Sequence, residues 1–417
     1  MGAIETYRLS CGLPVVVETM SNVRSAGVSW LIPAGSALDP AGREGLSAMW
    51  SHLVLRGAGE RDSRAQADAL DALGVSRGSD VHTYSVELTA TMLGSRVVEA
   101  LPLLVDAVRR PRIEREAVEA VRALCVQSLE GVEDDPQERV MLGLRKRHSP
   151  DPIGRGPYGT MEGLEGASVE EVVEGWRERA RPRGEGSVLA VAGAVKGREV
   201  VDALEKLTKG WEGEAPKVME GAQAERGYGH EVDETNQVHI AMGFDAPAEG
   251  SGDSALERVT GAVLSGGMSG RLFTEVREKR SLCYSVHATY GADKTYGRMT
   301  AYSGTTPERA QETMDVLWGE MTRINGKGGG VTKEEHARAV VGLKSRIVMS
   351  GESTSARAGA LAQDWRKLGR CRTLEELVSQ VDGATWERVN EYLARREMGR
   401  ATVMTIGPSA LKAPVGV

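Results

Sequence analysis

The sequence predicts an α+β protein made of two similar domains, each a mostly antiparallel sheet covered by helices. The chain of 417 residues is longer than one hydrophobic core usually organises. Strand-like segments are mixed with segments of helical periodicity, a combination typical of the α+β class. The same order of elements returns after roughly 210 to 218 residues, and a repeat of that length indicates a duplicated domain.

The first half begins with two strand patterns, at 13–20 and 26–37, in which Gly and Pro interrupt β-branched and apolar residues. Helical patterns follow at 45–56 and 63–74, and a glycine closes the second of them. The rest of this half is expected to form a strand with one polar face, two amphipathic helices and a buried strand, at 85–93, 97–110, 114–132 and 186–195.

The second half repeats this order from residue 236 onward. A strand at 236–247 precedes a helix at 253–267, and that helix contains VLSG where the first half has VLRG. Two strands and then two helices follow, at 282–291, 296–304, 306–324 and 332–350. The stretch 209–235 is rich in Gly, Glu and Ala and lacks apolar periodicity. We therefore expect an exposed linker there, between domains at 1–208 and 236–417.

The composition excludes several classes of function. Hydrophobic residues make up 41% and charged residues 27%, as in a globular, soluble protein. The net charge of -7 and the presence of only 2 Phe argue against a nucleic-acid partner. No apolar run is long enough to span a membrane, and the N-terminus lacks the pattern of a signal peptide. The 4 cysteines are widely spaced and form no C-x-x-C pair, which indicates a reducing compartment, so we expect a cytoplasmic protein.

Four segments carry a resemblance to a known family: CGLPVVVE, PAGSALDPAGREGLSAMWSHLVLRGAG, HSPDPIGRGPYGTMEGL and LSGGMSGRLFTEVREKRSLCYSV. The last of these is the most specific. With them, the chain resembles the insulinase/pitrilysin-type zinc peptidases and their noncatalytic relatives over nearly its whole length. The resemblance implies two α+β halves that close like a clam shell around a peptide chamber.

Active members of that family carry the motif H-x-x-E-H on a helix of the first half. Its two histidines share one helical face and bind zinc, and the Glu activates the zinc-bound water. The corresponding positions in this sequence are Ala48, Ser51 and His52, and the downstream Glu ligand, 76 residues further on, corresponds to Ser128. A single imidazole is a poor zinc site, so the resemblance implies no metal ligands and no catalytic group in this motif.

Replacement ligands and a serine nucleophile are both poorly supported. Glu130 and Glu133 follow Ser128 at spacings that point them elsewhere on a helix, and no two histidines stand three or four residues apart. Ser51 and Ser128 lack a paired base with an acidic partner. We expect His52 to be a helix histidine that packs or forms a hydrogen bond; weak or shared metal binding is the alternative.

The second half retains a pair of residues that the resemblance marks as functional. Arg277 and Tyr284 lie in VREKRSLCY, and the family comparison implies that they bind substrate in trans at the zinc site of an opposing half. There they would hold the substrate carbonyl and stabilise the developing oxyanion. The alternative is a structural role, as an ion-paired helix residue and an aromatic residue that opens a strand. The segment SGGMSG lacks the P-loop pattern and is expected to allow close helix packing.

These observations favour a noncatalytic subunit of a heterodimeric zinc peptidase, whose partner is an active, zinc-bearing paralogue. This chain would supply half of the peptide chamber, with peptide pairing to an exposed sheet edge, for which 85–93 is the candidate. No cofactor is expected in this chain, and zinc is expected in the partner. One alternative is a catalytically inert peptide-binding or scaffold protein that acts as a homodimer. A second is an autonomous metallopeptidase with a rebuilt metal site.

Overall fold

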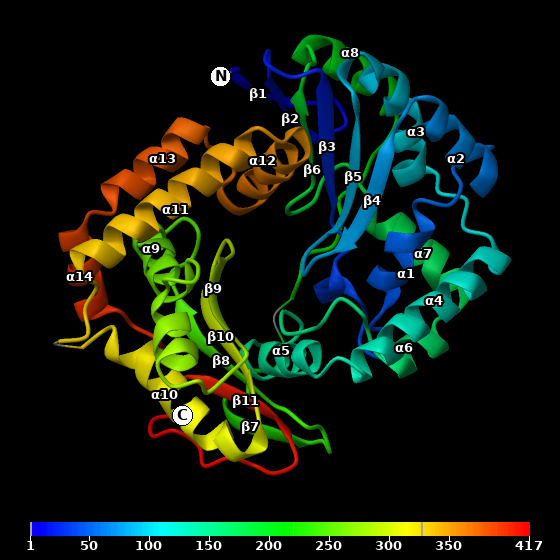
Figure 1. The fold of residues 1–417 in the computed structure, drawn as a ribbon. Coiled ribbons are helices and arrows are strands. Elements are labelled where there is room, and N and C mark those ends of the chain that lie inside the picture. Colours follow the sequence, from blue (N-terminus) through cyan, green and yellow to red (C-terminus); the bar gives the residue numbers. More distant parts are fainter. Residues whose placement is uncertain (1, 220, 327) are drawn as a thin grey trace. The chain divides into compact units, whose positions relative to one another are not determined.

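The computed structural model describes residues 2–219, 221–326 and 328–417, which fold into two compact units (Figure 1). Unit 1 consists of Met1–Gly131, Arg155–Gly221 and Ser350–Arg372, and unit 2 consists of Val132–Gly154, Ala222–Met349 and Thr373–Val417. Each unit therefore takes one segment from the opposite half of the sequence. The domains expected at 1–208 and 236–417 were contiguous in sequence, so this exchange of segments between the units was not expected.

Unit 1 is built on a mixed sheet with the strand order β1-β2-β6-β3-β5-β4. Strands β2 and β6 pair in parallel, and the other described neighbours are antiparallel. The strands are β1 (Ile4–Arg8), β2 (Pro14–Thr19), β3 (Ser25–Ile32), β4 (Ser76–Val81), β5 (Val86–Leu93) and β6 (Val188–Gly193). The four strands expected in the first half are confirmed as β2, β3, β5 and β6. Strands β1 and β4 were not expected, and the sequence of β4, SRGSDV, offers almost no apolar pattern.

Helices cover both faces of this sheet. One face packs on the main core of the unit, to which α1, α3, α4, α7 and α8 contribute, and the other face packs on α12. The helices are α1 (Leu46–Leu53), α2 (Ser63–Ala72), α3 (Val97–Arg109), α4 (Arg115–Glu133), α6 (Met161–Gly166), α7 (Val169–Arg179), α8 (Gly197–Leu207) and α12 (Thr354–Leu368), with the turns η1 (Ser36–Leu38) and η2 (Gly94–Arg96). Because both faces are covered, β2 and β6 read as continuous apolar runs.

Unit 2 has a second mixed sheet, with the strand order β7-β11-β8-β10-β9. Its strands are β7 (Gly227–Val232), β8 (Val238–Ala246), β9 (Ser285–Ala292), β10 (Gly297–Thr305) and β11 (Thr402–Gly407). Strand β7 lies inside the segment 209–235 that was expected to be a linker, and it pairs in parallel with β11. For residues 227–232 the linker expectation is therefore wrong, and residue 220 of that segment lies outside the described residues.

The helices of unit 2 are α5 (Pro136–His148), α9 (Ser254–Ser265), α10 (Ala310–Arg323), α11 (Lys333–Gly351), α13 (Leu374–Gly383) and α14 (Trp386–Arg395), with the turns η3 (Phe273–Glu278) and η4 (Pro307–Arg309). Helix α5 comes from the first half of the sequence and packs Val140 and Leu144 on Ala241 and Tyr302 of the sheet. The opposite face packs on the core formed with α9, α10, α11 and α14. The expected α+β class, with two mostly antiparallel sheets and covering helices, is confirmed.

No helix in the described part of the chain combines the length and the apolar character that a membrane crossing requires.

Candidate functional site

Helix α1 carries the first three positions of the zinc motif. Ala48 and Ser51 are buried, with exposed fractions of 8% and 6%, and the Ser51 Oγ donates a hydrogen bond to the Ala48 carbonyl at 2.8 Å. His52 is exposed and follows Ala48 by four residues, so the two positions share one helical face. Partial burial and the charge of Arg56 lower the pKa of His52.

A buried carboxylate holds the start of α1 in place. The Asp39 Oδ2 accepts hydrogen bonds from the Gly45 N–H at 2.8 Å and from the Ser47 Oγ at 2.9 Å. Its Oδ1 accepts from the Ser47 N–H at 2.9 Å. Asp39 thus satisfies N–H groups that the glycine preceding the helix cannot cap with a side chain. Burial nevertheless raises the pKa of Asp39 to about 6, because these donors and Arg179 only partly offset it.

The pKa of Asp39 predicts a pH-dependent stability. Because the folded value of about 6 lies above the ordinary value of 3.8, the fold favours the protonated carboxyl. This stabilisation is complete below the ordinary value and is lost as the pH rises through the folded value. Asp39→Asn cannot ionise, so the free energy of unfolding of this variant, measured relative to that of the wild type, should rise by about 2.5 kcal/mol between about pH 4 and pH 7.5. Urea titrations at several pH values measure this difference, and a constant difference would contradict the prediction.

Ser128, at the position of the downstream ligand, lies on α4. Its side chain is exposed, and its Oγ donates to the Leu124 carbonyl at 2.8 Å. The spacing places Ser128 on the same helical stripe as the buried residues Val121 and Cys125. Glu130 is exposed on a different face of α4, as the sequence led us to expect.

Arg277 and Tyr284 lie together in unit 2. Arg277 belongs to η3, a π-helical turn, and Tyr284 immediately precedes β9. The guanidinium carbon of Arg277 lies 4.8 Å from the centroid of the Phe273 ring and 5.2 Å from that of the Tyr284 ring. These are cation–π distances, so two aromatic rings hold the guanidinium. The contribution of Phe273 was missed in the sequence, although its spacing of four residues from Arg277 was a signal.

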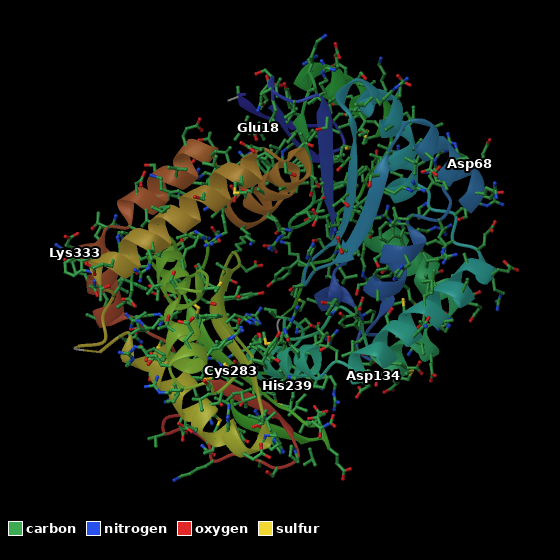
Figure 2. The ribbon with its side chains drawn as sticks, viewed as in Figure 1. Glu18, Asp68, Asp134, His239, Cys283 and Lys333 are labelled. Carbon is green, nitrogen blue, oxygen red and sulfur yellow. The ribbon has the colours of Figure 1, made fainter. Side chains whose placement is uncertain are left out.

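The guanidinium of Arg277 and the hydroxyl of Tyr284 remain available. The nearby carboxylate of Glu275 is already bonded to the Lys279 Nζ at 2.7 Å and to the Arg280 Nη1 at 2.9 Å. Within the described residues, the Arg277 guanidinium has no hydrogen bond or ion pair, which argues against the ion-paired alternative. Tyr284 is 84% exposed. Burial raises the pKa of the adjacent Cys283 thiol (Figure 2), so this thiol stays protonated near neutral pH.

The strand expected to receive a peptide is not at a sheet edge. Strand β5, which corresponds to 85–93, pairs with β3 on one side and with β4 on the other. The expectation is therefore wrong, because a strand paired on both sides has no free backbone groups to offer. Among the described strands of unit 1, β4 is the edge next to it, and its polar sequence suits an exposed position.

Comparison with known proteins matches both halves of the chain to one family. The family described as insulinase (peptidase family M16) matches residues 14–150, and the one described as peptidase M16 inactive domain matches residues 182–343. The chain belongs to the insulinase (M16) family. An uncharacterized zinc protease of Mycobacterium leprae is 27% identical over 409 residues, which cover 96% of this M16 chain and 91% of that protein.

Solved structures share the fold of this M16 protein. A peptidase M16 inactive domain from Pseudomonas fluorescens matches with a TM-score of 0.86 at 18% identity, covering 99% of this chain and 100% of that one. A chain in the structure of complex III2 from Candida albicans matches with a TM-score of 0.80 at 17% identity, covering 97% and 96%.

The zinc ion that the family implies does not fit the residues of this M16 chain. The side chains at the four motif positions provide one imidazole, one methyl group and two hydroxyls, and both hydroxyls donate to their own helices. Across the described residues, no group of three His, Cys, Asp or Glu side chains is placed to hold a metal ion. A zinc site of the usual kind needs at least three such ligands.

Proposed function

We propose that this chain is a noncatalytic subunit of a two-chain zinc peptidase. It would contribute peptide-binding surface and the Arg277/Tyr284 pair, while a paralogue with an intact H-x-x-E-H motif would hold the zinc ion. The observation that carries the proposal is the asymmetry between the two sites. Two of the three ligand positions are Ala48 and Ser128 and the general-base position is Ser51, whereas the Arg277 guanidinium contacts two aromatic rings and its donors are unpaired within the described residues.

The arrangement of Arg277 suits the task of binding a carbonyl oxygen. A guanidinium that needs no local acid to hold it can direct its N–H groups outward. The exposed Tyr284 hydroxyl adds a second donor beside it. Two preorganised donors at one oxygen stabilise the negative charge that develops when the carbonyl of a peptide is attacked. In this proposal the partner's zinc supplies the activated water, and this chain positions the carbonyl.

Backbone pairing is a second way in which the chain would hold a peptide. Strand β4 lies at an edge of the unit 1 sheet, where its outer N–H and C=O groups can pair with an extended chain. Such pairing depends little on peptide side chains, so it supports binding of peptides in general.

The test is peptide turnover by the complex of this chain with an H-x-x-E-H relative from the same source. Arg277→Ala is expected to lower kcat about a hundredfold and Tyr284→Phe about tenfold, because each removes a donor to the oxyanion. Neither substitution should prevent assembly. Arg280→Ala is the matched control, since Arg280 lies three residues from Arg277 but is bonded to Glu275. Unchanged turnover in assembled complexes of both variants would refute the proposed role.

A second candidate is a catalytically inert scaffold or peptide-binding protein that acts as a homodimer. The similarity to a chain of complex III2 favours it, because that chain has this fold within a larger assembly. Light scattering of the purified chain, alone and mixed with the H-x-x-E-H relative, separates the two candidates. A homodimer that ignores the relative would favour the scaffold, and a mixed dimer would favour the peptidase subunit.

A further inference from the structure

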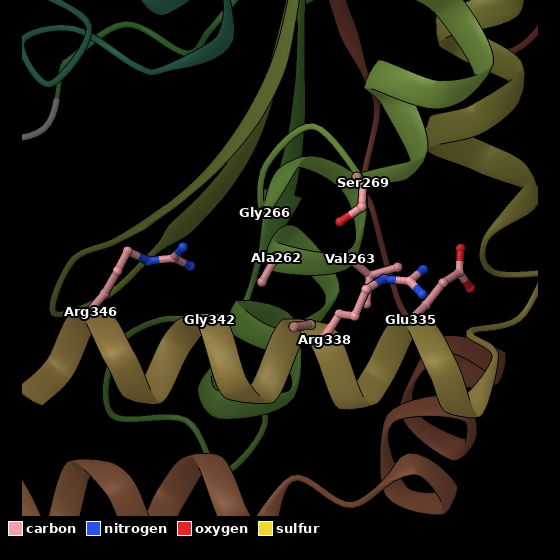
Figure 3. Close-up of a pocket in the computed structure, with 10 residues that line it drawn as sticks. Ala262, Val263, Gly266, Ser269, Glu335, Arg338, Gly342 and Arg346 are labelled. Atoms are coloured by element: carbon pink, nitrogen blue, oxygen red, sulfur yellow. The ribbon is translucent and has the colours of Figure 1, made fainter. Parts of the chain in front are cut away.

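A pocket in unit 2 lies outside the Arg277/Tyr284 pair. It is bounded by one face of α11 and by the glycine-rich loop that follows α9 (Figure 3). Arg338 and Arg346 rise from the same side of α11, the side on which the loop with Gly266 and Ser269 lies. Gly342 stands between the two arginines, so three residues spaced by four form the helix side of the pocket.

The pocket is positively charged. Its acidic residue, Glu335, accepts hydrogen bonds from the Arg271 Nε at 2.9 Å and Nη2 at 2.7 Å, so its charge is already neutralised. Within the described residues, Arg338 and Arg346 have no ion pair or hydrogen bond, and both are exposed. Two guanidinium groups therefore face the pocket without a counter-charge. Unpaired cations that share a pocket attract an anionic ligand.

The loop side of the pocket adds neutral donors. The Ser269 hydroxyl points from the loop toward α11 (Figure 3), and no hydrogen bond engages it among the described residues. The N–H groups of Met268 and Ser269 are likewise without a partner in that part of the chain. Hydroxyl and backbone N–H groups beside two guanidiniums are the donors that a carboxylate accepts from.

Apolar side chains flank these charges. On α11, Met349 is 69% exposed and lies on the helical face that carries the arginines. Met268 of the loop is also largely exposed. Exposed apolar residues beside a charged pocket fit a ligand that has both acidic and apolar groups, such as a peptide.

We infer that this pocket binds the carboxylate side chains of an acidic, partly apolar segment of a peptide. Arg338 and Arg346 are eight residues apart, so their Cα atoms are separated by about 12 Å along α11. An extended peptide spans that distance in about four residues, so two acidic side chains four residues apart, which lie on the same side of the extended chain, match the two arginines. The inference rests on the proposed function in taking a peptide as the ligand, but it concerns binding by this chain alone.

The experiment measures peptide binding to the purified full chain by fluorescence anisotropy. The probe is a labelled, C-terminally amidated peptide with two Glu residues four apart among Leu and Val, and its matched form has Gln in place of Glu. The Glu peptide is expected to bind at least about tenfold more tightly than the Gln peptide, and the preference should decrease as salt rises. R338Q/R346Q should remove this preference. R64Q/R198Q, which removes the same charge from exposed arginines elsewhere, should retain it.

A second variant tests the pocket without altering charge. A Cβ atom at Gly342 would meet only the Arg346 guanidinium, at 3.8 Å, so Gly342→Leu can fill the space between the arginines without a backbone clash. This variant should bind the Glu peptide at least about fivefold more weakly than the wild type does.

Equal binding of the two peptides, no binding of either, or equal losses in R338Q/R346Q and R64Q/R198Q would overturn the inference. Its failure is distinct from that of the proposed function, which is measured as turnover by the Arg277 and Tyr284 variants in the complex.

Discussion

Replacing Ala48 with His and Ser128 with Glu is expected to convert a chain without a zinc site into one that binds about one zinc ion. Position 48 lies one helical turn from His52, so the two imidazoles would share a face of α1. Ser128 lies on the stripe of α4 that also carries the buried Cys125, and a Glu there would supply the third ligand. Elemental analysis after dialysis against a limiting zinc buffer measures the result.

The order in which the ligands are restored makes this prediction specific. Ala48→His alone provides two imidazoles and should bind zinc weakly, and adding Ser128→Glu should tighten binding by at least about tenfold. Ser51→Glu restores the general base rather than a ligand, so it should leave the zinc content unchanged. The control is A48Q/S128Q, whose side chains are of similar size but ligate poorly. If A48H/S128E holds no more zinc than this control, the assignment of these positions to the motif is wrong.

Apolar periodicity predicted several of the elements that bury a regular face, although β11, α8 and α14, which also bury such a face, were not named from it. Strand β5 alternates buried and partly exposed residues along nearly its whole length, and β8 is almost continuously buried. The edge strands β4 and β7 escaped prediction because their sequences, SRGSDV and GYGHEV, contain polar residues and glycine. Such strands are held by hydrogen bonds to one neighbour, and a backbone interaction leaves no pattern of side chains to read.

The exchange of segments between the units could not be predicted for a related reason. The apolar faces of α5 and α12 indicate that each helix covers something, but not which sheet it covers. Gly27 illustrates the point, because a Cβ atom there would lie 2.5 Å from the carbonyl oxygen of Thr354 at the start of α12. The glycine is explained only by a segment more than 300 residues away, a close approach that the sequence does not reveal.

The candidate sites show the same limit. Three of the zinc-motif positions and the Arg277/Tyr284 pair could be named from the sequence because they belong to recognisable segments, and Ser128 was located by its spacing of 76 residues from the motif. The cationic character of the α11 pocket could not, because it depends on Glu335 being bound by Arg271, which is 64 residues away. Counting charges along α11 alone would have paired Glu335 with its neighbour Arg338.

The exchanged helix α12 is anchored by a buried ion pair whose disruption should cost more stability than any surface change. Arg357 of α12 is 2% exposed, and its Nε donates to the Glu18 carboxylate of β2, which is 4% exposed. The Arg357 Nη2 also donates to the Arg372 carbonyl at 2.7 Å. Arg357→Met should lower the free energy of unfolding by about 3–5 kcal/mol, since it leaves the Glu18 carboxylate buried without a partner.

A double variant separates the effect of the unpaired charge from the effect of the lost side-chain packing. E18L/R357M replaces both charges with apolar groups and should recover most of the stability that Arg357→Met loses, because no buried charge remains. Arg64→Ala is the control, since it breaks an exposed ion pair with Asp68 and should lower the free energy of unfolding by less than about 1 kcal/mol.

Urea unfolding followed by tryptophan fluorescence reports on this region, because Trp365 of α12 packs on the same apolar cluster. If the double variant is as unstable as the single one, the loss comes from packing of the Arg357 side chain. If the single variant is as stable as the wild type, Glu18 and Arg357 do not anchor α12 to the sheet.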